Sequence, residues 1–358
     1  MKAKAMVAVE PDHLELQEFD VVPPEIDQIL MKLGATSVCA SDPKILSGKV
    51  PLMGQFPLIL GHEIAGEVAA IGKDAAEIHH LQVGDRITVE PMRVCGHCER
   101  CRTEFNYHKC RPMWAYGATM TADNPPYLFG GYAEYMYLLP GTLLHKLDKG
   151  VPFTSACLSS VIGNGVRWVK HLAQMTYGQR LVISGAGSQG LAALMVAKEC
   201  GVGPIAMLGL GRDKKRFELA REFGVDHTIN IEVEDPLEAV PDLLGGPPEV
   251  VVETSGAPSA IQSALKMVKM MGKVVTIGVS GRKQTAIDFD TLVVKGVQIL
   301  ADHAQAGNFQ DAMRIINSQK YAIEKINNYS YSLEELPKAL EETTDPPDGF
   351  IKGVVKFD

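Results

Sequence analysis

The sequence predicts an α/β protein with two domains, one irregular and β-rich and the other a doubly wound parallel sheet. Its 358 residues exceed what one hydrophobic core usually organises. Short β-type runs broken by Gly and Pro fill the chain up to about residue 150, and strand-like runs alternate with helical patterns after it. A late return of β-type sequence allows the C-terminus to rejoin the first domain. We therefore expect one domain over residues 1–155, completed by 304–358, and a second over residues 156–303.

The first domain is predicted from short strands, because no long helical pattern dominates its sequence. After the second domain, two stretches have the apolar spacing of helices and a final run is strand-like. The predicted strands are 29–33, 67–71, 86–89, 132–138 and 353–357, and the predicted helices are 309–318 and 333–342.

The second domain is predicted from strands and helices that alternate. A short apolar run at 181–184 is followed by Gly185, and residues 191–200 then have the apolar periodicity of a helix. Units of this length imply a parallel sheet with helices on both faces. The remaining predicted strands are 205–210, 228–231, 250–253 and 273–279, and the remaining helices are 214–223 and 260–270.

Composition and charge exclude several classes of protein. Apolar residues make up 46% and charged residues 22% of the chain, as in ordinary globular proteins. A net charge of −8 provides no basic field for nucleic acid. No apolar run approaches the length of a membrane span, and residues 1–12 lack the apolar core of a signal peptide. The seven cysteines are an odd number, which argues against a disulfide framework, so we expect a cytoplasmic location.

A glycine-rich motif predicts a dinucleotide site between the first strand and the first helix of the second domain. Gly185-Ala186-Gly187-Ser188-Gln189-Gly190 fits the pattern G-x-G-x-x-G of a Rossmann fold. Gly185 allows the tight turn, Gly187 lets the backbone approach the pyrophosphate, and Gly190 permits close packing of helix on sheet. Ser188 and Gln189 then lie at the helix N-terminus, whose N–H groups attract phosphate.

The end of the next predicted strand favours NADP(H) over NAD(H). An NAD site usually has Asp or Glu here for the ribose 2′-hydroxyl, but this chain has Gly211 followed by Arg212. A small residue leaves room for a 2′-phosphate, and a cation offsets its charge. The alternative is that the basic residues Lys214, Lys215 and Arg216 only solvate the face of a helix. The acidic Asp213 also weakens the argument for NADP(H).

Four cysteines in one short segment predict a structural zinc site. They supply four thiolates, the closed tetrahedral ligand set that leaves no position for water. His97 and His108 lie among them and could compete as ligands, although four sulfurs suffice. The cysteines are Cys95, Cys98, Cys101 and Cys110.

Two further motifs contain ligand-type residues in the β-rich domain. Cys39-Ala40-Ser41-Asp42 supplies a thiolate, and Gly61-His62-Glu63 supplies an imidazole and a carboxylate. A thiolate and an imidazole from separate segments can hold Zn²⁺ with a position open for substrate. Glu63 could orient His62 or bind the metal itself.

These motifs, with Gly66-Glu67-Val68 and Val83-Gly84-Asp85-Arg86, resemble the zinc-containing medium-chain dehydrogenase/reductase family over nearly the whole chain. The resemblance implies a GroES-like catalytic domain and an inserted Rossmann domain. It implies that Cys39 and His62 bind a catalytic zinc and that Ser41 begins a proton relay. It further implies hydride transfer between NADP(H) or NAD(H) and a small alcohol, aldehyde or ketone, in a homodimer or homotetramer.

The third zinc ligand of the family has no clear counterpart here. It lies about 25 residues before the glycine motif and is Cys, Asp or Glu, but that position falls on Ser160 or Val161. Cys157 is one helical turn early and is more typical of a core residue. Glu63 therefore becomes a candidate third ligand.

Two smaller departures accompany this one. Lys44 replaces a relay histidine, so the outer proton step could end on Lys44 or on water. The spacing from Cys101 to Cys110 is one residue longer than is common. Because the third zinc ligand has no clear counterpart, one alternative is a quinone or enoyl reductase of the same fold without catalytic zinc. A second alternative is a non-enzymatic cofactor-binding protein, because a fold alone does not establish a function.

Overall fold

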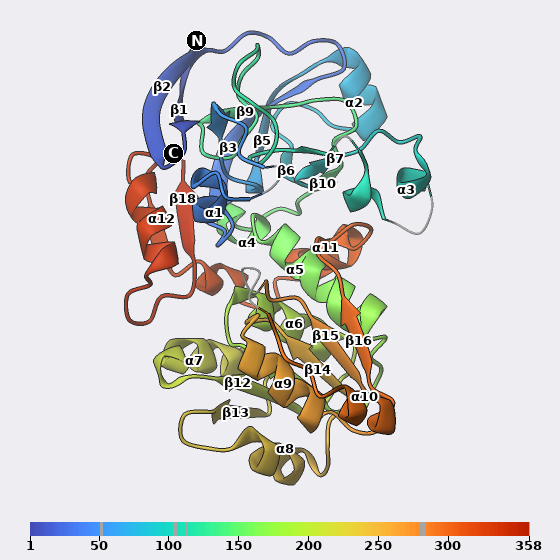
Figure 1. Cartoon of the computed structure of the whole chain (residues 1–358). Helices are drawn as coiled ribbons and strands as arrows, with labels where there is room; N and C mark the ends of the chain where they lie inside the picture. The colour runs from blue at the N-terminus through green and yellow to red at the C-terminus, as the bar shows by residue number, and fades with distance from the viewer. Residues whose placement is uncertain (51–52, 103–105, 112, 280–283, 358) are drawn as a thin grey trace. The chain divides into compact units, whose positions relative to one another are not determined.

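The chain forms two compact units in the computed structural model, which describes residues 1–50, 53–102, 106–111, 113–279 and 284–357. The first unit comprises Met1–Ser160 and Phe309–Asp358, and the second comprises Val161–Asn308. Figure 1 shows their elements coloured along the chain. Each unit has its own sheets and its own apolar core, so each is described by itself.

A seven-stranded sheet with β3 near its middle organises the first unit. β3 pairs antiparallel with β5, β9 and β18. Because β18 pairs with β3 through Val355 and Thr36, the C-terminal segment completes a sheet of N-terminal strands. The strands are β3 (Ile29–Ser37), β5 (Glu63–Ile71), β6 (Arg86–Val89), β9 (Tyr135–Leu138), β10 (Leu144–Lys146), β17 (Tyr329–Tyr331) and β18 (Gly353–Lys356).

Two smaller sheets complete the first unit. One contains the hairpin of β1 (Lys2–Glu10) and β2 (His13–Asp20), with β4 (Leu58–Ile59) on the other side of β1. The second pairs β7 (Met92–Arg93) with β8 (Trp114–Ala115), which brings together the two ends of the cysteine-rich segment.

The helices of the first unit are short and lie between or after the strands. They are α1 (Asp42–Leu46), α2 (Lys73–His79), α3 (Glu99–Arg102), α4 (Phe153–Ala156), α11 (Phe309–Asn317) and α12 (Leu336–Thr344). Short 3₁₀ helices cover Tyr107–Lys109 and Ile323–Ile326. The predicted helix at 333–342 begins later because Pro337 occupies its first turn, where its missing N–H costs nothing.

The second unit is a six-stranded, fully parallel sheet in the order β13-β12-β11-β14-β15-β16. The chain moves outward from β11 in one direction and then in the other, which places the topological switch point between β11 and β14. The predicted doubly wound fold is therefore confirmed. The strands are β11 (Leu181–Ser184), β12 (Ile205–Gly209), β13 (His227–Asn230), β14 (Val250–Glu253), β15 (Lys273–Thr276) and β16 (Gln298–Ala301).

Helices follow the strands of this sheet, as the labels of Figure 1 show. α5 (Ser159–Val166) continues into a π-helical turn, Arg167–Leu172, that packs against α6. The longest described helix is α6 at 12 residues, and no described helix is long and apolar enough to cross a membrane. The helices that come after α5 in this unit are α6 (Ser188–Glu199), α7 (Lys214–Glu222), α8 (Pro236–Leu244), α9 (Pro258–Met267) and α10 (Phe289–Lys295).

Several predicted boundaries were wrong. The helix predicted at 260–270 begins at Pro258 and ends before Val268, whose backbone is extended. The strand predicted at 132–138 starts only at Tyr135, because Tyr132 instead donates its N–H to Leu60. The elements α8, α10 and β16 were not predicted. α8 contains two prolines, which disfavour a helix prediction, and α10 is short and buries none of its side chains.

Candidate metal centres and nucleotide site

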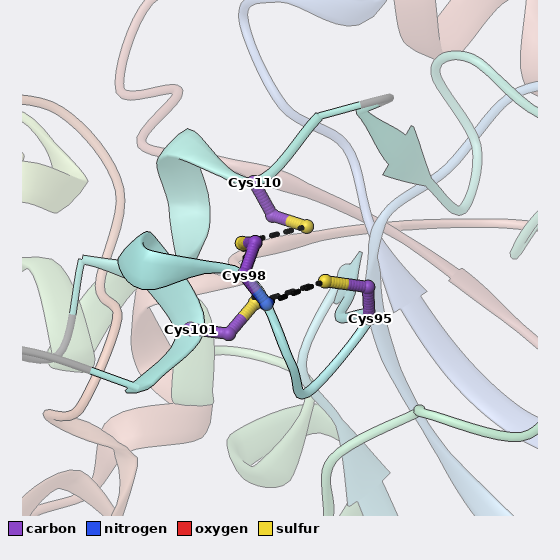
Figure 2. Close-up of side chains that lie close together, drawn as sticks. All are labelled: Cys95, Cys98, Cys101 and Cys110. Atoms are coloured by element: carbon purple, nitrogen blue, oxygen red, sulfur yellow. Dashed lines mark hydrogen bonds between the residues drawn. The ribbon is translucent and has the colours of Figure 1, made fainter.

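The four cysteines of the first unit lie together around one small space. Figure 2 shows their side chains turned toward one another, and all four sulfur atoms lie within 4.8 Å of each other. Measured separations are 3.5 Å between Cys98 and Cys101, 3.7 Å between Cys95 and Cys101, and 3.9 Å between Cys98 and Cys110. A tetrahedron with Zn–S bonds of about 2.3 Å has edges of about 3.8 Å. The donor set and its spacing therefore fit zinc.

Local backbone structure presents these thiols. Cys95 follows β7, Cys98 and Cys101 flank or lie in the single turn of α3, and Cys110 follows the 3₁₀ turn Tyr107–Lys109. The backbone N–H groups of His97 and Cys98 lower the pKa of the Cys95 thiol to about 6. Burial raises the pKa of Cys101 to about 12. Zinc binding would therefore replace protons on the more buried thiols.

The two histidines of this segment are not part of the group. His97 is exposed, and its Nδ1 lies 2.9 Å from the carbonyl oxygen of Cys95. His108 is buried in the 3₁₀ turn, and its nitrogens are not among the atoms that converge. The predicted all-cysteine ligand set thus remains the one that the geometry supports.

A buried carboxylate ties the cysteine segment to the sheet. Glu90 directly follows β6, and its two oxygens contact the Tyr107 hydroxyl at 2.5 Å and the His145 Nε2 at 2.8 Å. His145 also stacks on Phe309, with ring centroids 5.1 Å apart. This network anchors the segment through a residue that the sequence analysis did not identify.

A second group of ligand-type atoms forms where β3 and β5 meet. Cys39 lies just beyond the end of β3, and His62 and Glu63 lie at the start of β5. Ser37 and Glu63 are partners in the antiparallel register, so the two ends coincide. One ligand atom each from Cys39, His62 and Glu63 lies within 4.8 Å of the others.

Asp42 organises this second group, although sequence reasoning gave it no role. Its carboxylate is fully buried and accepts hydrogen bonds from the Cys39 N–H at 2.9 Å and from the Tyr132 hydroxyl at 2.6 Å. Its other oxygen lies 3.1 Å from Nδ1 of His62. A carboxylate on Nδ1 fixes the imidazole so that Nε2 faces the site, which is the usual support for a metal-binding histidine. The motif Cys-x-x-Asp was the available sequence signal.

The charges around His62 favour a cation at this position. Burial lowers the pKa of the imidazole, but the negative charges of Asp42 and Cys39 raise it by more, so its net pKa lies well above the usual range. Burial and Asp42 likewise raise the pKa of Tyr132, which keeps that hydroxyl protonated as a donor. The buried negative charges of this group thus attract positive charge.

Lys352 forms a buried ion pair with Glu63. Its Nζ lies 2.9 and 3.2 Å from the two Glu63 oxygens and donates to the carbonyl of Val38 at 2.8 Å. Burial lowers the pKa of this ammonium, but Glu63 and Cys39 raise it by more. Lys352 immediately precedes β18, so the C-terminal strand delivers it. The sequence analysis missed it because a single lysine before a short apolar run is unremarkable.

The other candidates for a third ligand lie outside the group. Cys157 is completely buried, accepts a hydrogen bond from Asn327 at 3.4 Å, and has a pKa raised to about 12, first of all by burial. Ser160 and Val161 are also buried and are not among the converging atoms. Of the described candidates, Glu63 is the one that shares the space with Cys39 and His62.

The predicted relay residues have different environments. The Ser41 hydroxyl lies 3.2 Å from the Cys39 sulfur and 3.5 Å from Nε2 of His62. Lys44 is exposed on α1, one turn further along the chain, and is not one of the converging groups. The structure thus brings Ser41 to the site and leaves Lys44 at its periphery.

In the second unit, the glycine motif has the geometry of a phosphate-binding turn. Gly185 has a φ of +113° directly after β11. A Cβ on Gly190 would lie 2.0 Å from the Gly185 carbonyl oxygen, whereas a Cβ on Gly187 would meet nothing within 4 Å. Gly190 therefore allows helix and strand to touch, and Gly187 leaves open space beside the backbone. α6 begins at Ser188, and Gln189 accepts a long 3.5 Å contact from Asn164.

The basic run after β12 is partly neutralised. Asp213 accepts the Leu210 N–H at 2.8 Å and pairs with Arg216 at 2.6 Å, so it faces back into its own turn. Lys215 pairs with Glu218 at 3.0 Å. Arg212 is exposed beside Gly211.

Comparisons with known proteins match both units. The family model "alcohol dehydrogenase GroES-like domain" matches residues 25–149, and "zinc-binding dehydrogenase" matches residues 190–318. A probable alcohol dehydrogenase of Mycobacterium tuberculosis is 30% identical over 98% of both chains. The chain belongs to the zinc-containing medium-chain dehydrogenase/reductase family. As a member it is a nicotinamide-dependent oxidoreductase of the zinc-type alcohol dehydrogenase class, and its GroES-like and Rossmann folds are confirmed.

Other members of this family and related structures agree in fold. An L-threonine 3-dehydrogenase of Thermococcus kodakarensis is 35% identical over 82% of this chain and 80% of its own. An alcohol dehydrogenase of Thermotoga maritima superposes with a TM-score of 0.91 at 23% identity, over 99% of both chains. A putative zinc-binding dehydrogenase of Sinorhizobium meliloti, bound to NADP, has a TM-score of 0.88 at 22% identity and covers both chains completely. The last two similarities concern the fold alone.

Proposed function

We propose that this medium-chain dehydrogenase oxidises a small alcohol, or reduces the matching aldehyde or ketone, at a zinc ion held by Cys39, His62 and Glu63. The observation that carries the proposal is that these three ligand atoms lie within 4.8 Å of one another, next to the buried Asp42 that contacts His62 and Cys39. When bound, zinc would polarise the substrate oxygen and the nicotinamide would exchange a hydride with the substrate carbon. The GroES-like domain, near residues 1–155 and 304–358, would hold this site, and the domain near 156–303 would hold the cofactor.

Ser41 is proposed to move the substrate proton. Its hydroxyl lies beside both Cys39 and His62, the residues next to which a zinc-bound substrate oxygen would lie. Ser41 would therefore be within reach of the alcohol proton and could accept it. As it accepts that proton, Ser41 would pass its own hydroxyl proton to a water molecule or to the exposed Lys44 in its neutral amine form. Asp42 would hold His62 in one orientation throughout, because it contacts Nδ1 and itself accepts two further hydrogen bonds.

Glu63 is proposed as the third protein ligand in place of the family's missing residue. Together with a Cys39 thiolate it would balance the charge of Zn²⁺, while Lys352 holds the carboxylate in place. Glu63→Gln removes the charge and leaves Lys352 buried without its partner, which costs about 3–5 kcal/mol when a buried pair is broken. We expect the variant to lose one zinc per chain. Retention of about two zinc ions per chain in folded Glu63→Gln would contradict the assignment.

Metal analysis combined with a substrate screen tests the function as a whole. Relatives include dehydrogenases named for threonine, erythritol or threitol, and sorbitol. A panel of simple, amino and polyhydric alcohols, followed by cofactor absorbance at 340 nm, should therefore show turnover. About two zinc ions per chain would support the proposal. One zinc ion with reduction of quinones or enoyl compounds would support the alternative reductase, and cofactor binding without any turnover would support a non-enzymatic protein.

For the cofactor, we propose a preference for NADP(H) over NAD(H). Gly211 carries no acidic side chain at the end of β12, and the adjacent Arg212 is exposed, whereas Lys215 and Arg216 are engaged with acids. An exposed cation at the end of this strand suits a 2′-phosphate. The ratio of kcat/KM for the two cofactors measures this preference, and a clear preference for NAD would contradict it.

We further propose that the chain forms a homodimer or homotetramer through its Rossmann domain. Exposed apolar side chains gather on α10 and at the neighbouring edge strand β16, which has an unpaired outer edge within the described sheet. Exposed apolar side chains that are grouped on a domain surface mark interaction sites. The exposed apolar side chains include Phe289, Val293, Val294 and Ile299. Light scattering after size-exclusion chromatography measures the number of chains in the assembly.

The predicted cytoplasmic location is a separate proposal, and cell fractionation tests it.

A further inference from the structure

Gly211 and Glu232 lie side by side just beyond two neighbouring strands of the parallel sheet. β12 and β13 are parallel, and Gly209 is paired with Asn230 at their carboxyl ends (Figure 1). The Ile231 N–H donates to the Gly209 carbonyl at 3.0 Å, which extends the pairing by one step. Gly211 lies two residues after Gly209, and Glu232 lies two residues after Asn230.

The Glu232 carboxylate occupies the space that a side chain at position 211 would fill. Its Oε2 accepts a hydrogen bond from the Gly211 N–H at 2.6 Å. A Cβ built on Gly211 would lie 3.0 Å from that same oxygen. The segment that carries Glu232 is held in place, because the Glu232 N–H donates to the Asn230 side chain at 3.1 Å and the next two N–H groups donate to the Asn230 carbonyl.

From this placement, and resting on the proposed use of a nicotinamide dinucleotide, we infer that Glu232 supplies the carboxylate that position 211 lacks. In dinucleotide-binding sheets, an acidic residue near the end of the strand that corresponds to β12 accepts a hydrogen bond from the 2′-hydroxyl of the adenosine ribose. Asp213, the nearest acid in sequence, cannot do so because Leu210 and Arg216 engage it. Glu232 is therefore a cofactor-specificity residue that is contributed by the neighbouring strand.

Two opposite charges then act on the ribose 2′ position. Arg212 attracts the 2′-phosphate of NADP(H), and Glu232 repels it while accepting a hydrogen bond from the 2′-hydroxyl of NAD(H). Glu232 thus limits the preference for NADP(H) and keeps NAD(H) usable. Removing its charge must shift the preference further toward NADP(H).

The test compares cofactor binding by the intact zinc-loaded protein and its Glu232→Gln variant. Glutamine keeps the length and an acceptor oxygen for Gly211 but loses the charge. Fluorescence titration gives Kd for NADH and for NADPH. A charge-assisted hydrogen bond changes a binding constant about tenfold or more, so Kd(NADH)/Kd(NADPH) should rise at least about tenfold. A ratio within about twofold of the parent would overturn the inference.

Two further variants separate charge at this position from charge in general. Glu234→Gln removes an exposed acid two residues along the same turn, and it should leave the ratio within about twofold of the parent. Gly211→Asp in the Glu232→Gln background restores a carboxylate to the same space and should recover tight NADH binding. An equal shift in Glu234→Gln, or no recovery in the double variant, counts against Glu232.

The experiment also separates this inference from the proposed function. If the parent protein binds neither cofactor, the proposed oxidoreductase function fails and takes the inference with it. If the parent binds both cofactors and Glu232→Gln leaves their ratio unchanged, only the assignment of Glu232 fails.

Discussion

The two candidate metal centres of the first unit are built in opposite ways. The cysteine group comes from one segment closed by the β7–β8 pair, and its four thiols fill every tetrahedral position. The second group takes Cys39 and His62 from two strand ends, and depends on Asp42 and on Lys352 from the C-terminal segment. A closed site thus needs only local sequence, whereas a site with an open position needs buried charges delivered by the tertiary fold.

The largest expected difference is in turnover. His62→Ala should lower kcat by about 10³-fold or more, because Lewis-acid stabilisation contributes several kcal/mol to the transition state. Zinc content should fall from about two to about one per chain, and Kd for NADPH should stay within twofold. Absorbance at 340 nm, metal analysis and fluorescence titration measure these three quantities. Cys39→Ser should behave in the same way, and undiminished turnover in either variant would refute the zinc mechanism.

Substitution in the cysteine group should instead affect stability. Cys98→Ser should release the structural zinc, and losing a ligand present at a thousand times its Kd costs about 4 kcal/mol. For a unit of this size that corresponds to a fall in Tm of roughly 8–16 °C. Calorimetry measures Tm, and kinetics at 25 °C should show kcat within a few-fold of the parent. Lost turnover with an unchanged Tm would mean that the roles of the two centres are reversed.

An intermediate effect is expected at Asp42, which supports only the second centre. Asp42→Asn weakens the contact to His62 Nδ1. Residues that support a metal ligand in this way typically contribute about 10- to 100-fold to metal affinity or activity, so we expect a loss of that size. Competition with a chelator measures the affinity. Tyr132→Phe is the matched control, because it removes one hydrogen bond to Asp42 and keeps the carboxylate, so its loss should be smaller. Equal losses of zinc affinity in the two variants would mean that general packing, and not the Asp42 carboxylate, supports His62.

The smallest effect is expected at Cys157, which lies close to the second centre without joining it. Cys157→Ala should keep about two zinc ions per chain and a kcat within about twofold of the parent. Its free energy of unfolding should fall by about 1 kcal/mol, as for an average buried substitution. Loss of a zinc ion in folded Cys157→Ala would make this thiol the third ligand in place of Glu63.

Sequence reasoning worked where the determining contacts are close along the chain. The strands at 86–89, 181–184 and 250–253 were predicted at their observed bounds, because each is a short run rich in Val or Ile. The elements α10 and β16 were not predicted although both contain apolar residues, because each is short and most of its side chains are exposed in the structure. Lys352 was missed for a related reason, because its partner Glu63 is distant in sequence.

The sequence by itself determined the fold class, the family, the glycine-rich turn after β11 and the segment that gathers four thiols. Each of these follows from residue types at fixed short spacings. The tertiary structure alone decided that Asp42 orients His62, that Lys352 pairs with Glu63, and that Glu232 fills the space beside Gly211. These contacts depend on which strands are neighbours and in what register, and long-range pairing of this kind is not encoded in local spacing.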